Sequence, residues 1–97
     1  MASAPASVPA AVSPAGWRLL SRPGCHLCDE FSDELLTAFP SLSSLLKWVD
    51  VDSRDDWRAR FGRTIPVLLD PSQQAVCETF FDRAAVAAAL ARNRVVE

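Results

Sequence analysis

Cys25 and Cys28, two thiols separated by two residues, are the side chains of this sequence best suited to chemistry. They end the stretch Ser-Arg-Pro-Gly-Cys-His-Leu-Cys, residues 21–28, which directly follows a short apolar run. Two thiols at this spacing can close a small disulfide reversibly, and a helix beginning there would stabilise the thiolate of the first cysteine. The pair therefore predicts electron transfer by thiol–disulfide exchange.

The segments on either side of the cysteines have the patterns of a strand and a helix. Residues 17–20 are mostly apolar and precede a Pro-Gly turn, which predicts a strand that delivers the chain to Cys25. After Cys28, apolar residues recur at Phe31 and Leu35, which predicts an amphipathic helix that ends before Pro40. We therefore expect Cys28 on the buried face of the helix and Cys25 at its accessible start.

A second strand and a second helix are expected in the middle of the chain. A polar connection at residues 41–44 leads to an apolar run at 45–51, and a strand there would lie parallel to the first because a helix joins the two. Ser53 with Asp56 resembles a capping box that would start the second helix, and Gly62 suits the end of that helix.

The last third of the chain predicts a hairpin and a final helix. Residues 65–69 and 75–79 have the composition of strands, and the turn signal at 70–73 joins them. Asp82 is placed to cap an Ala-rich helix. The predicted fold is α/β with the order βαβαββα, a four-stranded mixed sheet flanked by helices.

Composition limits the size and the partners of this domain. With 97 residues, of which 49% are hydrophobic, the chain supports one domain, which we place at residues 16–97. Residues 1–15 are rich in Ala, Pro and Ser and lack charge, which predicts a disordered tail. The net charge of -2 gives no basic surface for nucleic acid. We expect a monomer.

The same sequence indicates a cytoplasmic protein without membrane association. No Lys or Arg precedes the only candidate signal segment, which Pro9 interrupts, and no apolar run approaches the roughly 20 residues of a membrane span. A disulfide-rich secreted scaffold usually has several pairs of cysteines, whereas this chain has three cysteines, a small and odd number. A reducing compartment therefore fits better.

Four features together resemble a known family. They are the strand running into Cys25-His26-Leu27-Cys28, the order βαβαββα, the segment Thr64-Ile65-Pro66-Val67 and the acidic start of the last helix at Asp82. This combination is similar to the thioredoxin fold and, within it, to a small bacterial glutaredoxin-like protein. Two cysteines at this spacing are only a moderately specific signal for the family. Together with a Thr-Ile-Pro about forty residues later, they are a strong one.

The resemblance implies a substrate site around the third strand. In such proteins the proline is cis and the backbone before it faces the active-site sulfur, which implies a cis bond at Pro66 and substrate pairing at Ile65, next to Thr64. Arg63 stands beside this segment and could receive a substrate carboxylate. Asp82 would correspond to the residue that holds the glutathione amine.

The implied activity is that of a thiol–disulfide oxidoreductase in cell redox homeostasis. Cys25 would attack the disulfide of a protein or of a glutathione mixed disulfide, and Cys28 would then release the reduced substrate. Arg22 and His26 are expected at the substrate site as well. The helix start, Arg22 and protonated His26 would lower the pKa of Cys25, opposed by the carboxylates after Cys28. His26 fits equally well as an exposed residue without a catalytic role.

The active-site sequence departs from that of a typical dithiol glutaredoxin. The inner dipeptide is His26-Leu27, and Cys-Glu-Thr-Phe-Phe at residues 77–81 replaces a Gly-Gly pair. Glycines allow the backbone to approach a tripeptide closely, so this departure leaves glutathione binding open. We expect no bound cofactor, and glutathione or thioredoxin reductase as the electron donor.

Two other functions fit parts of the pattern. Cys25, Cys28 and Cys77 could bind zinc or another soft metal, although a fourth ligand is lacking. A non-catalytic thioredoxin-fold interaction module is the other alternative. Cys77 itself is interpreted as a small buried apolar residue, with a regulatory thiol as the competing interpretation.

Overall fold

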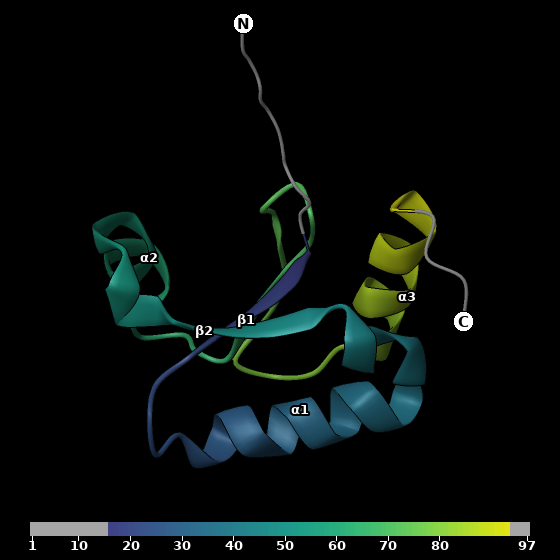
Figure 1. The fold of residues 1–97 in the computed structure, drawn as a ribbon, viewed down its shortest axis with the longest axis horizontal. Coiled ribbons are helices and arrows are strands. Elements are labelled where there is room, and N and C mark those ends of the chain that lie inside the picture. The colour runs from purple at the N-terminus through teal and green to yellow at the C-terminus, as the bar shows by residue number, and fades with distance from the viewer. Residues whose placement is uncertain (1–15, 94–97) are drawn as a thin grey trace, which may run out of the picture.

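Four short strands form one mixed sheet in the order β2-β1-β3-β4 in a computed structural model that describes residues 16–93 (Figure 1). The strands are β1 (Trp17–Ser21), β2 (Leu46–Asp50), β3 (Val67–Leu69) and β4 (Ala75–Glu78). Strand β1 pairs in parallel with β2 and antiparallel with β3, and β3 pairs antiparallel with β4. The predicted mixed sheet is therefore confirmed, including its parallel pair.

Three α-helices and two 3₁₀ helices connect and cover these strands. They are α1 (His26–Ala38), η2 (Pro40–Ser44), η3 (Val51–Ser53), α2 (Asp55–Phe61) and α3 (Arg83–Arg92). Apart from the 3₁₀ segments, the order is the predicted βαβαββα. In the described part of the chain, no helix has both the length and the apolar character needed to cross a membrane.

The sheet has a hydrophobic core on each face. Successive side chains of a strand point to opposite faces, so Leu19 and Leu20 enter different cores. Leu19 packs in a cluster with residues of α1 and α3, whereas Leu20 packs with Trp57 and Phe61 of α2. In Figure 1, α2 and α3 accordingly lie on opposite sides of the sheet. Helices therefore cover both faces of the sheet, α1 and α3 on one and α2 on the other.

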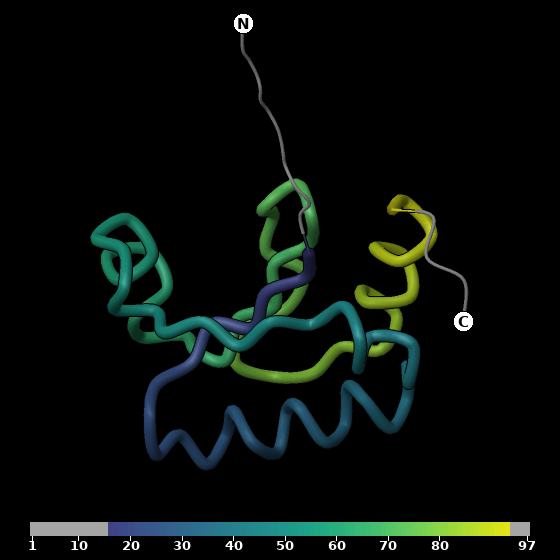
Figure 2. Tube along the Cα trace, viewed as in Figure 1, coloured from purple at the N-terminus to yellow at the C-terminus, as the bar shows by residue number. Residues whose placement is uncertain are grey.

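The segment after β4 runs alongside α1 before α3 begins, as the trace in Figure 2 shows. Phe81 in this segment makes edge-to-face contacts with Phe31 and Phe39, with ring centroids 6.0 and 6.4 Å apart. Aromatic pairs favour this geometry. These contacts hold the segment after β4 against α1, from Phe31 within the helix to Phe39 at its C-cap.

The predicted capping box of the second helix is wrong. Helix α2 begins at Asp55, its N-cap is Arg54, and no side chain caps it. Ser53 instead donates its hydroxyl to the Asp50 carbonyl, 2.6 Å away, and closes η3. The Asp56 carboxylate accepts hydrogen bonds from the Arg54 guanidinium. Both members of the expected box are thus engaged by closer partners.

Other boundaries also differ from those predicted by one or two residues or by a short 3₁₀ segment. The connection at residues 41–44 is part of η2, which Pro40 starts, because proline fits the first turn of a helix. Strand β3 begins at Val67, since Pro66 has no N–H to donate to a neighbouring strand. Strand β4 ends at Glu78 because Thr79 has a left-handed φ of 70°. The predicted tail at residues 1–15 lies outside the described residues.

Candidate functional site

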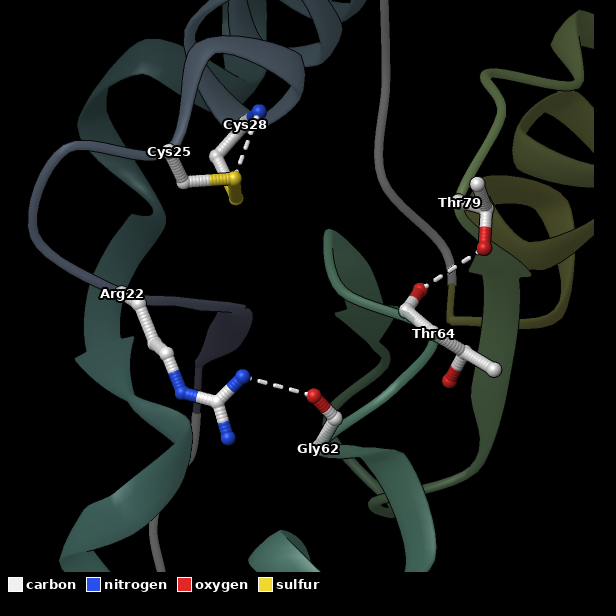
Figure 3. Close-up of a disulfide and its surroundings, with 6 residues drawn as sticks. All are labelled: Arg22, Cys25, Cys28, Gly62, Thr64 and Thr79. Atoms are coloured by element: carbon white, nitrogen blue, oxygen red, sulfur yellow. Dashed lines mark hydrogen bonds between the residues drawn. A yellow bond between two sulfur atoms is a disulfide. The ribbon is translucent and has the colours of Figure 1, made fainter.

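A disulfide joins Cys25 and Cys28 at the N-terminus of α1 (Figure 3). Cys25 is the N-cap of the helix, in extended backbone geometry, and its sulfur accepts a hydrogen bond of 3.1 Å from the Cys28 N–H. The Cys28 side chain is fully buried, whereas Cys25 is partly exposed. The predicted inequivalence of the two thiols is therefore confirmed.

This geometry suits a thiolate at Cys25 when the pair is reduced. The N–H that reaches the Cys25 sulfur would then donate to an anion, and hydrogen bonds to charged acceptors are about twice as strong as neutral ones. The helix N-terminus favours negative charge at the same place. His26, the first residue of α1, is exposed, and its predicted role in tuning the Cys25 pKa stays a prediction.

The Arg22 side chain connects the loop before Cys25 to the segment around α2. Its guanidinium donates to both carboxylate oxygens of Asp52, at 2.8 and 3.0 Å, and to the Gly62 carbonyl at 2.7 Å. In Figure 3 this side chain extends toward Gly62. These hydrogen bonds give Arg22 a structural role, and the predicted contribution to the Cys25 pKa and to substrate binding stays a prediction.

Glycine is required at position 62 by close packing and not by its backbone angles. Its φ is -58°, as in an ordinary helix, but a Cβ atom there would lie 2.5 Å from the Arg58 carbonyl oxygen and 3.1 Å from the Arg22 guanidinium. The expected helix end at Gly62 is confirmed, since it is the C-cap of α2. Its small size lets Arg22 reach the backbone.

Replacing Asp52 with asparagine should make the stability of the protein less sensitive to acid. Hydrogen bonds from Arg22 hold the pKa of the Asp52 carboxyl below its usual value. A lowered pKa in the folded state means that the stabilisation is complete above the unfolded value of about 3.9 and is lost as the pH falls through the folded value. Thermal unfolding midpoints should therefore favour wild type near pH 6, and the difference should shrink as the pH falls below the unfolded pKa and through the lowered folded pKa of Asp52. A difference in unfolding midpoint between the two proteins that did not change with pH would show that the Asp52 carboxylate is not stabilised by Arg22.

The Ile65–Pro66 peptide bond is cis, as the resemblance implied, and Thr79 holds the chain on both sides of it. The Thr79 hydroxyl donates to the Thr64 carbonyl at 2.9 Å, and the Thr79 N–H donates to the Pro66 carbonyl at 2.8 Å. Figure 3 shows Thr79 and Thr64 joined in this way. The loop that contains three of the predicted substrate residues is thus fixed by the end of β4.

Sequence reasoning did not identify Thr79 as a residue of the site. Its φ of 70° lies in the left-handed region, which a β-branched side chain rarely adopts. Such strain persists only where the surrounding structure imposes it, and here two hydrogen bonds to the Thr64–Pro66 segment do so. The signal available in the sequence is that residues 77–81, which include Thr79, replace the Gly-Gly pair of a typical dithiol glutaredoxin.

Replacing Thr79 with valine should lower the free energy of unfolding by about 1 kcal/mol, because the Thr64 carbonyl loses its hydrogen bond. Thr79→Ser keeps the hydroxyl and is the matched control, expected to stay within a few tenths of a kcal/mol of wild type. Urea unfolding of the three proteins measures the difference. Equal losses in the two variants would show that the hydroxyl bond contributes nothing.

The remaining predicted residues lie in separate surroundings. Ile65 is half-buried, and Arg63 is exposed. The Asp82 carboxylate accepts the Ala85 N–H at 3.1 Å, which confirms it as the N-cap of α3. Cys77 is buried and donates to the Asp82 carbonyl at 3.8 Å, and burial raises the pKa of its thiol. Cys77 is therefore the buried core residue that the sequence predicted.

Metal ligands do not gather in the described part of the chain. Among residues 16–93, no three His, Cys, Asp or Glu side chains lie close enough together to hold a metal ion. The soft-metal alternative therefore gains no support from the described residues.

Comparison with known proteins places this geometry in a family. The family described as glutaredoxin-like domain (DUF836) matches residues 18–91. Protein Ne2328 from Nitrosomonas europaea, solved in solution, is 24% identical, with 79% of this chain and 92% of that chain covered and a TM-score of 0.66. The crystal structure of protein XcR50 from X. campestris is 28% identical, with coverages of 78% and 96% and a TM-score of 0.58.

No curated protein matches the chain. The family match nevertheless spans β1 to nearly the end of α3, and it includes both cysteines and the cis-proline segment. The arrangement of a mixed sheet with helices on both faces agrees with the solved neighbours. The chain therefore belongs to the glutaredoxin-like domain family and has the thioredoxin fold.

Proposed function

We propose that this protein is a thiol–disulfide oxidoreductase that reduces disulfides by dithiol exchange through Cys25 and Cys28. The observation that carries the proposal is the Cys25–Cys28 disulfide at the start of α1, in which the Cys25 sulfur accepts a hydrogen bond from the Cys28 N–H. A sulfur in this position can alternate between disulfide and stabilised thiolate. The fold and the family support the same chemistry.

The reaction consists of two exchange steps. The Cys25 thiolate attacks one sulfur of a substrate disulfide, so that a Cys25–substrate disulfide forms and the other substrate sulfur leaves as a thiolate. Cys28 then loses its proton and attacks the Cys25 sulfur, which releases the second substrate thiolate and closes the Cys25–Cys28 disulfide. Two electrons pass from the protein to the substrate. A dithiol or two equivalents of a monothiol must return them.

The surroundings of the cysteines support this division of roles. Cys28 is fully buried, so a substrate can reach only Cys25, while the separation of 5.2 Å between the two Cα atoms allows Cys28 to complete the exchange. Protein disulfides and glutathione mixed disulfides are the candidate substrate classes. Glutathione with its reductase, or thioredoxin reductase, is the candidate electron donor, and a reducing cytoplasm is the proposed location.

A reduction assay with two donors tests the proposal. The protein is first reduced and freed of reductant, then mixed with a small neutral disulfide, and the released thiol is counted. We expect about one equivalent of disulfide reduced for each protein molecule, and continued turnover when one of the two donors is added with NADPH. No thiol released in the first experiment would overturn the proposal, whatever the donors do.

A further inference from the structure

A small groove lined by both apolar and acidic side chains lies beside Leu27 of the cysteine motif. Its volume is about 110 Å³, several times the roughly 30 Å³ of a liquid water molecule. Residues of α1, among them Leu27 before Cys28, form one wall, and the segment after β4 forms the other. The lining residues are Leu27, Glu30, Phe31, Glu34, Thr79, Phe80 and Phe81.

Two of the apolar side chains at this groove are not used by the fold. Leu27 is 49% exposed and Phe80 is 75% exposed, whereas Phe81 packs on the rings of Phe31 and Phe39. Large apolar side chains that stay exposed next to one another commonly mark a binding surface. The Thr79 conformation fixes the direction of the chain just before Phe80, so this side chain is placed by the same contact that holds the cis-proline segment.

The charged residues that line the groove and the cavity on the other side of Cys25 are mainly acidic, while Arg83 lines a neighbouring cavity together with Glu34 and Phe81. Glu30 and Glu34 are the charged residues that line the groove. On the other side of Cys25, a cavity of about 340 Å³ is lined by Asp29, Asp50 and Arg22, whose guanidinium is already bonded to Asp52. A ligand with two carboxylates, such as glutathione, would therefore meet carboxylates on both sides of the reactive sulfur. A cationic ligand would be attracted.

We propose, on the basis of the proposed function, that this groove binds the apolar side chain next to the disulfide-bonded cysteine of a polypeptide that also carries Lys or Arg nearby. The apolar side chain enters between Leu27 and Phe80, and the basic residue lies against Glu30 and Glu34. The substrate class is thus a basic protein segment with a disulfide, in preference to a glutathione mixed disulfide.

A set of matched disulfides tests the proposal by the rate of the first exchange step. Each substrate is a cysteine derivative joined to a neutral thiopyridine, whose release is followed by absorbance. Three short peptides contain Leu with Lys, Ala with Lys, or Leu with Glu, and the fourth substrate is the glutathione derivative. The enzyme is the reduced full-length chain.

We expect the peptide with Leu and Lys to react about tenfold faster than the peptide with Ala and Lys. The peptide with Leu and Glu and the glutathione derivative should be slower at low salt. Their disadvantage should shrink as the ionic strength rises from about 0.01 M to about 1 M, where the Debye length falls from about 30 to about 3 Å.

Variants connect these preferences to the groove. Phe80→Ala should bring the preference for Leu over Ala close to one, and Glu34→Gln should reduce the preference for Lys over Glu. Leu45→Ala removes another exposed apolar side chain that does not line the groove, and should leave both ratios unchanged. Equal rates for all four substrates, or equal effects of Phe80→Ala and Leu45→Ala, would overturn the docking proposal alone. Reaction with none of the substrates would overturn the proposed function as well.

Discussion

Replacing Cys25 with serine should reduce the rate of disulfide reduction by on the order of 10³-fold or more, because removal of an enzyme's nucleophile leaves only the effects of binding. A serine hydroxyl is not ionised near neutral pH, whereas the thiolate is the reacting form of cysteine. Release of thiol from a neutral disulfide by the pre-reduced variant measures the loss. The fold should not change, since Cys25 is partly exposed.

The companion variant Cys28→Ser separates the two steps of the exchange. Its Cys25 can still attack, but the neighbouring thiol that would release the product is gone, so a Cys25–substrate disulfide should accumulate to about one equivalent. Mass spectrometry of the intact protein detects the added substrate thiol. Cys77→Ala is the matched control and should behave as wild type, because this thiol is buried away from solvent. A mixed disulfide on Cys28 in the Cys25→Ser protein would reverse the assigned roles.

Replacing Phe31 with alanine should lower the free energy of unfolding by about 3 to 5 kcal/mol, the usual loss for an aromatic side chain removed from a core. Phe31 is 2% exposed, belongs to the core on the α1 face of the sheet, and contacts the Phe81 ring. Domains of this kind are stable by about 5 to 15 kcal/mol, so the variant would be marginal. Urea unfolding followed by far-ultraviolet circular dichroism measures the change.

Phe31→Leu is the matched control, since it keeps most of the buried volume and should lose much less. Leu27→Ala, at an exposed position on the same helix, should change stability by no more than about 0.5 kcal/mol. If Phe31→Ala behaved like Leu27→Ala, the contact between α1 and the segment after β4 would not contribute to the fold.

Features set by local pattern could be predicted from the sequence. The spacing of Cys28, Phe31 and Leu35 follows the period of a helix, so the burial of Cys28 was predictable without knowing what covers it. Asp82 was predictable as a cap because the hydrogen bond it accepts comes from a residue three positions later. The apolar runs likewise gave the strands, with boundaries that differ by one or two residues.

Contacts between distant segments could not be predicted in this way. Arg22 is 30 residues from Asp52 and 40 from Gly62, and no local pattern reveals that these groups meet. The contact of Thr79 with Thr64 spans 15 residues and depends on a backbone angle that threonine rarely adopts. The capping box at Ser53 failed for the opposite reason, since a local pattern was present but the Asp50 carbonyl provided a closer partner.

The position of Cys25 as the N-cap of α1 links the stability of the helix to the number of electrons the protein carries. The sulfur that caps the helix is neutral in the disulfide and becomes an anion when the pair is reduced and ionised. Whatever free energy the helix start gives to the anion therefore favours the reduced protein by the same amount, at about 1.4 kcal/mol for each unit by which it lowers the thiol pKa. The first turn of α1 therefore shifts the equilibrium between the disulfide and the reduced pair toward the reduced pair. Residues of this turn that never touch a substrate can thus change the reduction potential of the protein.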